Sequence, residues 1–282
     1  MSEVLVLAAI SLNTQVLVSA EAHAEPQSLE GQLLGHRTVL FAGRCLPKAV
    51  WRRRPTREFV FRLLDAAWVD RDRLTADLLY PDLPPAKASA ELRRTKWHIQ
   101  HVFGCPAIVY DPDTNAYGFD QRIVVLDCDT TRFERQMAAA RRQTDPASAL
   151  DSLRATLALY HGPFLPGEVS ISGWIERRRA DLSSLYIEGL GRAAELATAL
   201  GRFDETLDFL SRARDENPDD VQAGAALLAA LQSRGHHGRA PQLAHELSAR
   251  WPQDGQPLTA QPGGPFRLPA APASVSVSVR LA

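Results

Sequence analysis

The sequence predicts a mainly α protein with two folded parts, and three observations carry this prediction. Residues 30–122 contain three amphipathic helical patterns followed by a strand, a turn and a strand. Residues 123–252 are almost wholly helical in pattern, and matching turn residues recur there at a fixed spacing. The flanks differ in composition: residues 1–29 form an N-terminal extension, and residues 253–282 are rich in Pro, Gly, Ala and Ser, as flexible tails are.

Charge is distributed unevenly along the 282 residues, whose formal net charge is −1. From Arg44 to Lys96 there are 13 Lys or Arg residues and seven Asp or Glu residues, a local net charge of +6. The remainder of the chain therefore carries −7. A basic segment in an otherwise acidic chain indicates a polyanionic partner. The 3 scattered cysteines suit a reducing cytoplasm better than a disulfide framework.

The N-terminal stretch VLVLAAISLNTQVLVSAEAHA has the apolar run and the Ala-x-Ala-like end of a secretory signal. However, residues 1–20 contain no Lys or Arg, and Glu3 stands where a positive region belongs. We therefore expect an additional strand, a helix or a poorly ordered tail in a cytoplasmic protein. If the segment is cleaved, the alternative is a secreted or periplasmic repeat protein. No stretch reaches the roughly 20 apolar residues of a membrane span.

The basic part has the layout of a winged helix, in which three helices precede a β-hairpin. The first helix is expected over 56–68, with Phe59, Leu63 and Ala66 or Ala67 facing inward. A short second helix lies within 70–82, and the third covers about 86–103, after two prolines that set its start. Residues 107–120 read as strand, turn and strand. In this layout the third helix enters the major groove of DNA.

On a helical wheel the third helix separates into an apolar face and a cationic, aromatic face. The residues expected to face inward are Leu92, Thr95, Ile99, Val102 and Phe103. Those expected outward are Arg93, Arg94, Trp97 and His101, flanked by His98 and Lys87. Lys96 falls at the edge of the apolar face, where its stem can lie on the core while its ammonium reaches phosphate.

Lys and Arg neutralise phosphates, and Arg also pairs with guanine, so we predict a DNA-binding surface. On the third helix its members are Arg93, Arg94, Lys96, Trp97, His98 and His101; outside it they are Arg52, Arg53, Arg54, Arg57 and Asn115. Other interpretations remain open. Trp97 can instead pack on the hairpin or on another protein, and a run of basic residues is often only a solvated face.

The helical part has the tetratricopeptide period. Gly201 and Gly235 are 34 residues apart, as are Pro218 and Pro252, and each glycine is expected to open a pair of helices. Leu207, Leu210, Leu227 and Leu231 are expected to be buried between neighbouring helices. Stacks of this kind leave a concave face that binds a peptide or another domain. An unrelated helical bundle is the alternative.

Catalytic and metal-binding chemistry finds little support in the sequence. His98, His101 and Cys105 could lie along one side of a helix, but Gly104 and Pro106 should end the helix before the cysteine. There is no Gly-x-Ser-x-Gly elbow, and Asp127 and Asp129 read as strand-end and helix-cap residues. We therefore expect no enzymatic activity, no cofactor and no metal site.

Several stretches, in order, resemble the bacterial transcriptional activator domain family, the group that includes the Streptomyces antibiotic regulatory proteins. They are GQLLGHRTVLFAGRCLP, LLYPD, ELRRTKWHIQHVFG, DTTRFE, and LALYHGPFLPG followed by Trp174 and ERRRADL. The resemblance covers about residues 30–252. Two positions depart from the family pattern: Lys96 replaces a usually aliphatic residue, and the hairpin reads NAYGFD where the family tends to Gly-Tyr-x-Leu.

The resemblance implies an OmpR-like winged helix-turn-helix joined to an all-α tetratricopeptide-like domain. It also implies transcriptional activation through double-stranded DNA and RNA polymerase, without a nucleotide switch, since the chain has no Gly-x-x-x-x-Gly-Lys-Ser/Thr loop. We expect a DNA-binding regulator whose helical repeats contact RNA polymerase, another protein or a second copy, away from membranes. The alternative is a protein-interaction adaptor whose winged helix no longer binds DNA.

Overall fold

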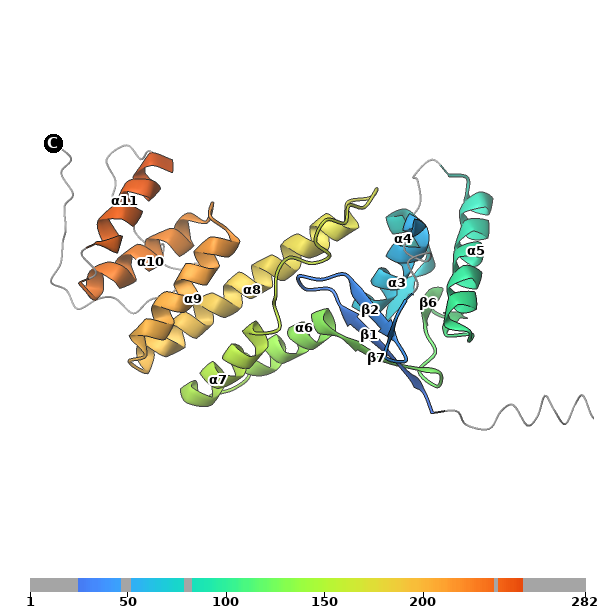
Figure 1. Cartoon of the computed structure of the whole chain (residues 1–282), viewed down its shortest axis with the longest axis horizontal. Coiled ribbons are helices and arrows are strands. Elements are labelled where there is room, and N and C mark those ends of the chain that lie inside the picture. Colours follow the sequence, from blue (N-terminus) through green and yellow to red (C-terminus); the bar gives the residue numbers. More distant parts are fainter. Residues whose placement is uncertain (1–24, 47–51, 79–82, 236–237, 251–282) are drawn as a thin grey trace, which may run out of the picture. The chain divides into compact units, whose positions relative to one another are not determined.

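A computed structural model describes residues 25–46, 52–78, 83–235 and 238–250 (Figure 1). The chain divides into two compact units. The N-terminal unit holds the described residues up to Gly31 and the described part of Thr38–Cys128. The C-terminal unit holds Gln32–Arg37 and the described residues from Asp129 onward. The closing SVSVSVRLA stretch, Pro252 and residues 1–24 of the N-terminal extension lie outside the described residues, whereas the last residues of the extension are described and begin strand β1 at Gln27.

Where the structure describes the N-terminal unit, it contains two small sheets and three helices. The first sheet has the order β3-β2-β1-β7 and contains β1 (Gln27–Gln32), β2 (Thr38–Phe41), β3 (Arg44–Cys45) and β7 (Val124–Cys128). Strands β1 and β7 pair in parallel, from Gln27 opposite Val124 to Gly31 opposite Cys128. The second sheet has the order β4-β6-β5 and contains β4 (Trp68–Asp70), β5 (Ile108–Asp111) and β6 (Ala116–Phe119).

The helices are α3 (Arg54–Ala66), α4 (Arg71–Leu78) and α5 (Pro85–Phe103). Proline occupies the first turn of α3 and of α5, where its missing N–H costs no hydrogen bond. Gly104 ends α5 in the left-handed conformation that glycine tolerates best, with φ 68°. The hairpin β5–β6 follows α5, as the sequence pattern predicts, and β4 adds a third strand that the pattern did not indicate.

The expected inward face of α3 was partly wrong. Phe59 and Leu63 are fully buried, but Ala66 is exposed and Ala67 is half-buried. The helix instead buries Val60, Phe61 and Leu64 as well, each at most 1% exposed. The reason is that α3 is central in its unit, since it contacts α4 and α5 and also strands β4, β6 and β7. A helix packed on several sides has no single apolar stripe.

The C-terminal unit consists of successive helices, each packed against the next (Figure 1). They are α6 (Asp129–Ala140), α7 (Pro146–Leu157), α8 (Trp174–Ala199), α9 (Phe203–Glu216), α10 (Val221–Ser233) and α11 (Arg239–Arg250). Gly201 and Gly235 both adopt left-handed φ values, 73° and 70°. Gly201 lies before α9 and Gly235 lies before α11, so α9 and α10 lie between the two glycines, and the expectation that each glycine opens a pair of helices stays a prediction.

Of the four leucines expected to be buried in the helical part, three are. Leu210, Leu227 and Leu231 are at most 3% exposed, whereas Leu207 is only half-buried. The difference follows from the register of α9, in which Phe209 and Leu210 supply the buried contacts.

A short segment from the N-terminal part of the chain completes the C-terminal unit. Leu33 and Leu34 are fully buried, and their backbone N–H groups donate to the Asp129 carboxylate at 2.8 and 2.9 Å. Leu34 forms an isolated antiparallel bridge with Phe164, and the Leu165 N–H donates to the Leu33 carbonyl at 2.8 Å. Asp129 therefore joins the start of α6 to residues almost one hundred positions away, in addition to standing in the first turn of that helix.

Candidate nucleic-acid interface

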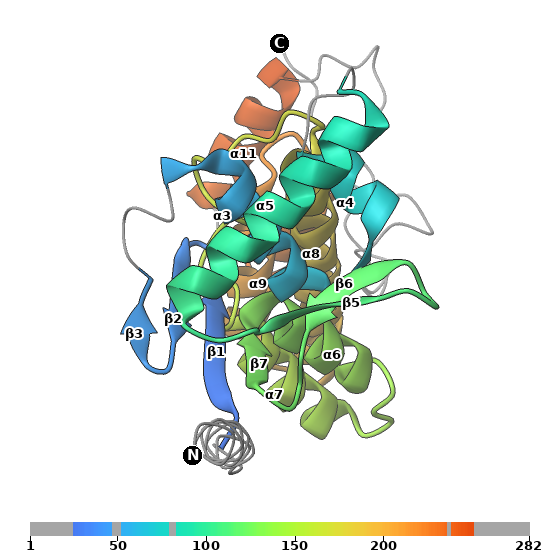
Figure 2. The same cartoon turned by 90° about the vertical axis from the view of Figure 1, so that its right-hand side faces the viewer.

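Helix α5 presents the two faces that the helical wheel predicts. Leu92, Thr95, Ile99 and Phe103 are buried, and Val102 is half-buried. On the opposite side Arg93, Arg94, Trp97, His101 and Lys87 are exposed, and His98 is half-buried. Figure 2 shows α5 on the viewer's side, with the hairpin β5–β6 beside it.

Trp97 stands out on the exposed face because 64% of this large apolar side chain is in solvent. Its ring stacks on that of His101, with the centroids 5.4 Å apart and the planes at 10°. The alternative in which Trp97 is buried against the hairpin does not fit this exposure. The stack leaves the indole available for a partner molecule.

Lys96 occupies the boundary between the two faces, where the wheel placed it. Its side chain is half-buried, and its ammonium lies 6.0 Å from the centre of the Tyr117 ring, on β6. Burial lowers the pKa of the Lys96 ammonium. Burial also raises the pKa of the Tyr117 hydroxyl, while the charges of Arg71 and Arg93 oppose that shift. Cationic and aromatic groups of α5 and the hairpin thus lie near one another. The DNA-binding surface predicted from the sequence did not include Tyr117 or Arg71.

The four arginines of residues 52–57, at the start of α3, lie in different environments. Arg53 forms an ion pair with Glu91 of α5 at 3.0 Å. Arg54 pairs with the fully buried Glu58 at 3.1 Å and donates to the Leu78 carbonyl, which ends α4. Arg52 is exposed, and Arg57 is half-buried. Arg53 and Arg54 therefore join elements within the unit, which is a structural use of residues that the sequence suggested for phosphate contact.

Asn115 has a similar structural use in the hairpin turn. Its side-chain carbonyl accepts from the Tyr110 hydroxyl at 3.0 Å, and its amide donates to the Asp70 carboxylate at 3.1 Å. Its backbone has φ 52°, a conformation that Asn tolerates better than most residues, and its carbonyl accepts from the Arg71 N–H. The side chain fastens the turn to the β4–α4 junction.

The hairpin turn is acidic, which the letters DPDTN already show. Asp111 accepts from the Thr114 hydroxyl at 2.7 Å and from the Asp113 N–H at 3.0 Å. These hydrogen bonds, that of Thr114 first, lower the pKa of the Asp111 carboxyl. Asp113 itself is exposed. Two carboxylates at the tip of a hairpin disfavour close contact with a phosphate backbone.

The candidate metal ligands are not brought together. Across the described residues, no group of three His, Cys, Asp or Glu side chains is placed to hold a metal ion. Cys105 follows the end of α5, as expected, and burial raises the pKa of its thiol.

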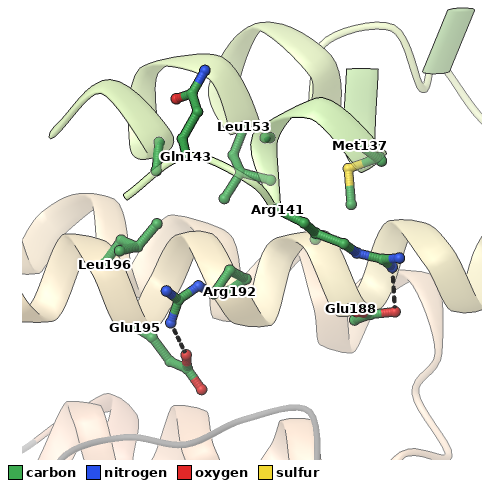
Figure 3. A pocket seen from close by; sticks show the side chains of 11 residues that line it. Met137, Arg141, Gln143, Leu153, Glu188, Arg192, Glu195 and Leu196 are labelled. Carbon is green, nitrogen blue, oxygen red and sulfur yellow. Dashed lines mark hydrogen bonds and ion pairs between the residues drawn. The ribbon is translucent and has the colours of Figure 1, made fainter. Parts of the chain in front are cut away.

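The C-terminal unit contains a cavity of about 290 Å³ between α6, α7 and α8 (Figure 3). Its apolar lining includes Met137, Leu153 and Leu196. Two ion pairs stand at its edge: Arg141 with Glu188 at 2.7 Å, and Arg192 with Glu195 at 2.8 Å. The lining residues come from three helices and from the turn between α6 and α7, without a common spacing, so no pattern in the sequence indicated this cavity.

A search of the described helices finds none with the length and apolar character needed to span a membrane. The two units thus define a mostly helical protein in which an all-helical C-terminal unit is joined to a unit that displays a cationic, aromatic helix. Residues 128–250 match the bacterial transcriptional activator domain, which is a domain of transcription regulators. The resemblance stated from the motifs DTTRFE and LALYHGPFLPG is confirmed. No curated protein matches the chain.

Proposed function

We propose that the protein is a sequence-specific DNA-binding regulator of transcription, an activator, that reads the major groove with α5. The observation that carries the proposal is the exposed row of Arg93, Arg94 and Trp97 in a chain that also contains a transcriptional activator domain. Arginine supplies phosphate neutralisation and guanine recognition. A regulator that binds DNA would act in the cytoplasm. The proposed function requires neither a cofactor nor a metal.

In this proposal residues 30–122 form an OmpR-like winged helix-turn-helix, with α5 as recognition helix and β5–β6 as the wing. The order of α3, α4, α5 and the hairpin supports it, as does the pairing of β4 with β6. Residues 1–29 are an extension, 123–252 the activator domain and 253–282 a flexible tail.

The site residues are assigned by their surroundings. Arg93, Arg94, Trp97 and His98 read bases, and Lys96 and His101 assist them from the edge and the end of the face. Arg52 and Arg57 contact phosphates. Arg53, Arg54 and Asn115, which were also candidates, act by holding α3, α4, α5 and the hairpin in place.

The helical unit is proposed to be a tetratricopeptide-like repeat that binds RNA polymerase, another regulatory protein or a second copy of the chain. The equivalent positions of Gly201 and Gly235 in two neighbouring helix pairs support this, because their spacing is that of the tetratricopeptide repeat. Repeats of this kind offer an extended surface to proteins.

The test is a salt titration of the binding of a fluorescent mixed-sequence duplex, measured by anisotropy. We expect a Kd of about 10⁻⁴ to 10⁻⁶ M at physiological salt and a steep salt dependence. Arg93→Ala/Arg94→Ala should reduce the slope of log K against log salt by about 0.9 for each phosphate that is no longer neutralised. The matched control is Arg192→Ala/Arg202→Ala, which removes the same charge from exposed positions of the helical unit. Equal slopes for both variants, or no binding at low salt, would refute the DNA-binding proposal.

The acidic hairpin tip favours a second candidate, an adaptor whose winged helix docks on a protein. The hairpin tip carries the carboxylates of Asp111 and Asp113, whereas a wing that lies beside phosphates is expected to carry cationic side chains. Exposed tryptophan and arginine are also the residues most enriched at the centres of protein interfaces. Loss of all salt-dependent DNA binding in the titration would leave this candidate standing.

A further inference from the structure

Trp97 is an exposed tryptophan on a cationic helix, and its exposure requires an explanation. The explanation rests on the proposed DNA-binding function. Most of the Trp97 ring is in water, although a ring of this size gains free energy from burial. Trp68, the other tryptophan exposed in the described residues, differs because its ring covers Gly118, where an added Cβ would lie 2.5 Å from it. Trp97 covers none of the described glycines in this way, so its apolar surface remains for a partner.

The indole is held in a defined orientation. Arg93, Trp97 and His101 are four residues apart, so they form one row along α5. His101 stacks nearly parallel on one side of the ring, with the planes at 10°. Despite this stack, 64% of the Trp97 side chain remains in solvent. An oriented side chain contributes more to recognition than a mobile one, because binding then costs less conformational entropy.

The charge around the ring selects a polyanion as partner. Arg93 begins this row and Arg94 lies beside it; both are exposed, and α5 contains one acidic residue, Glu91. Glu91 is 3.0 Å from Arg53 and 4.0 Å from Arg94, so its charge is compensated. DNA offers both kinds of group that this surface would contact: anionic phosphates for the guanidinium groups and an apolar base-edge group for the ring.

In the major groove, one of the base-edge groups is apolar: the C5 methyl of thymine. The other groups are hydrogen-bond donors and acceptors, and an indole can donate only through its single N–H. Arg93 and Arg94 have the donor geometry that fits guanine N7 and O6. We propose that Trp97 is a specificity-determining residue that contacts a thymine methyl group, with guanines contacted by the arginines in adjacent positions.

The test begins with selection of preferred sites by the full-length chain from a random duplex pool. Each thymine of the selected site is then replaced by deoxyuridine, which removes only the methyl group, and affinity is measured for wild type, Trp97→Ala and Trp97→Phe. At one thymine or more, the wild type should bind the deoxyuridine duplex about fourfold more weakly, the worth of one buried methyl group. Trp97→Ala should bind both duplexes equally, and Trp97→Phe should keep part of the difference. Deoxyuridine outside the selected site is the control.

The outcomes separate this inference from the function on which it rests. If binding is salt-dependent but no thymine discriminates, or Trp97→Ala still discriminates, the thymine contact is wrong and DNA binding stands. If selection enriches no sequence although binding is salt-dependent, base reading by Trp97 is also wrong. If no DNA binds, the function and the inference fall together. Circular dichroism checks that Trp97→Ala is folded, as expected for an exposed position.

Discussion

At the scale of single residues, arginines with similar sequence surroundings have different roles in this protein. Arg54 closes the end of α4 and pairs with a buried glutamate, while Arg93 extends into solvent. Helical periodicity predicted the exposure of Arg93 and Trp97, because the side of a helix follows from spacing alone. It could not predict the partners of Arg54 or Asn115, because these lie 24 and 45 residues away along the chain.

Asp113 provides a prediction about the hairpin. Its side chain is exposed, and the turn is maintained by Asp111, which accepts from the backbone N–H of residue 113. Asp113→Lys should therefore keep the turn while it removes a negative charge and adds a positive one. If the hairpin lies along phosphates, DNA affinity should rise and the salt slope should steepen by about 0.9. Anisotropy measures both. Asp181→Lys, at an exposed position of α8, is the control, and equal effects of the two changes would mean that the hairpin is remote from DNA.

At the scale of elements, the arrangement of α3 and α4 depends on a buried ion pair. Arg62 of α3 pairs with Asp77 of α4 at 3.0 Å and lies 3.8 Å from Asp65, and the three side chains are at most 11% exposed. Sequence patterns predicted both helices, yet they could not predict this contact, since α3 is apolar on several sides and its polar positions do not form one stripe. The pair fixes the two helices that precede α5.

Removing one partner of this pair should destabilise the N-terminal unit. Arg62→Met leaves the Asp77 carboxylate buried, which should cost about 3–5 kcal/mol. Hydrogen exchange of α3 and α4 amides under native conditions measures the destabilisation. Arg192→Met, which removes an exposed arginine from its pair with the half-buried Glu195 in the C-terminal unit, should change stability by less than about 0.5 kcal/mol. An effect no larger than that of the control would show that the Arg62–Asp77 pair does not stabilise the arrangement.

At the scale of the whole molecule, the two units do not follow each other simply along the chain. Residues 32–37 belong to the C-terminal unit, and the chain then returns to the N-terminal unit until Cys128. The family match begins at residue 128 and does not include this segment. Sequence patterns placed a single boundary at 122–123, because hydrophobic patterns report local structure and contain no information on contacts across 96 residues.

Two neighbouring leucines test this division. Leu29 and Leu33 are both fully buried, but Leu29 belongs to the N-terminal unit and Leu33 to the C-terminal unit. Leu33→Ala should cost about 2–5 kcal/mol and accelerate hydrogen exchange in α6 and α8. Leu29→Ala should have a similar cost but accelerate exchange in α3 and β7. Exchange that rises in the same helices for both variants would contradict the assignment of residues 32–37.

The segment 32–37 also bears on how such proteins can be recombined. A chimera joined at residue 128 would give the activator domain a foreign sequence in place of Leu33 and Leu34, and the two fully buried leucine side chains beside Asp129 would be lost from its core. Exchange of DNA-binding parts between relatives of this architecture should therefore succeed when the crossover spares these six residues. Evolutionary selection for a stable activator domain would then also act on residues 32–37, which lie well outside the family match at residues 128–250.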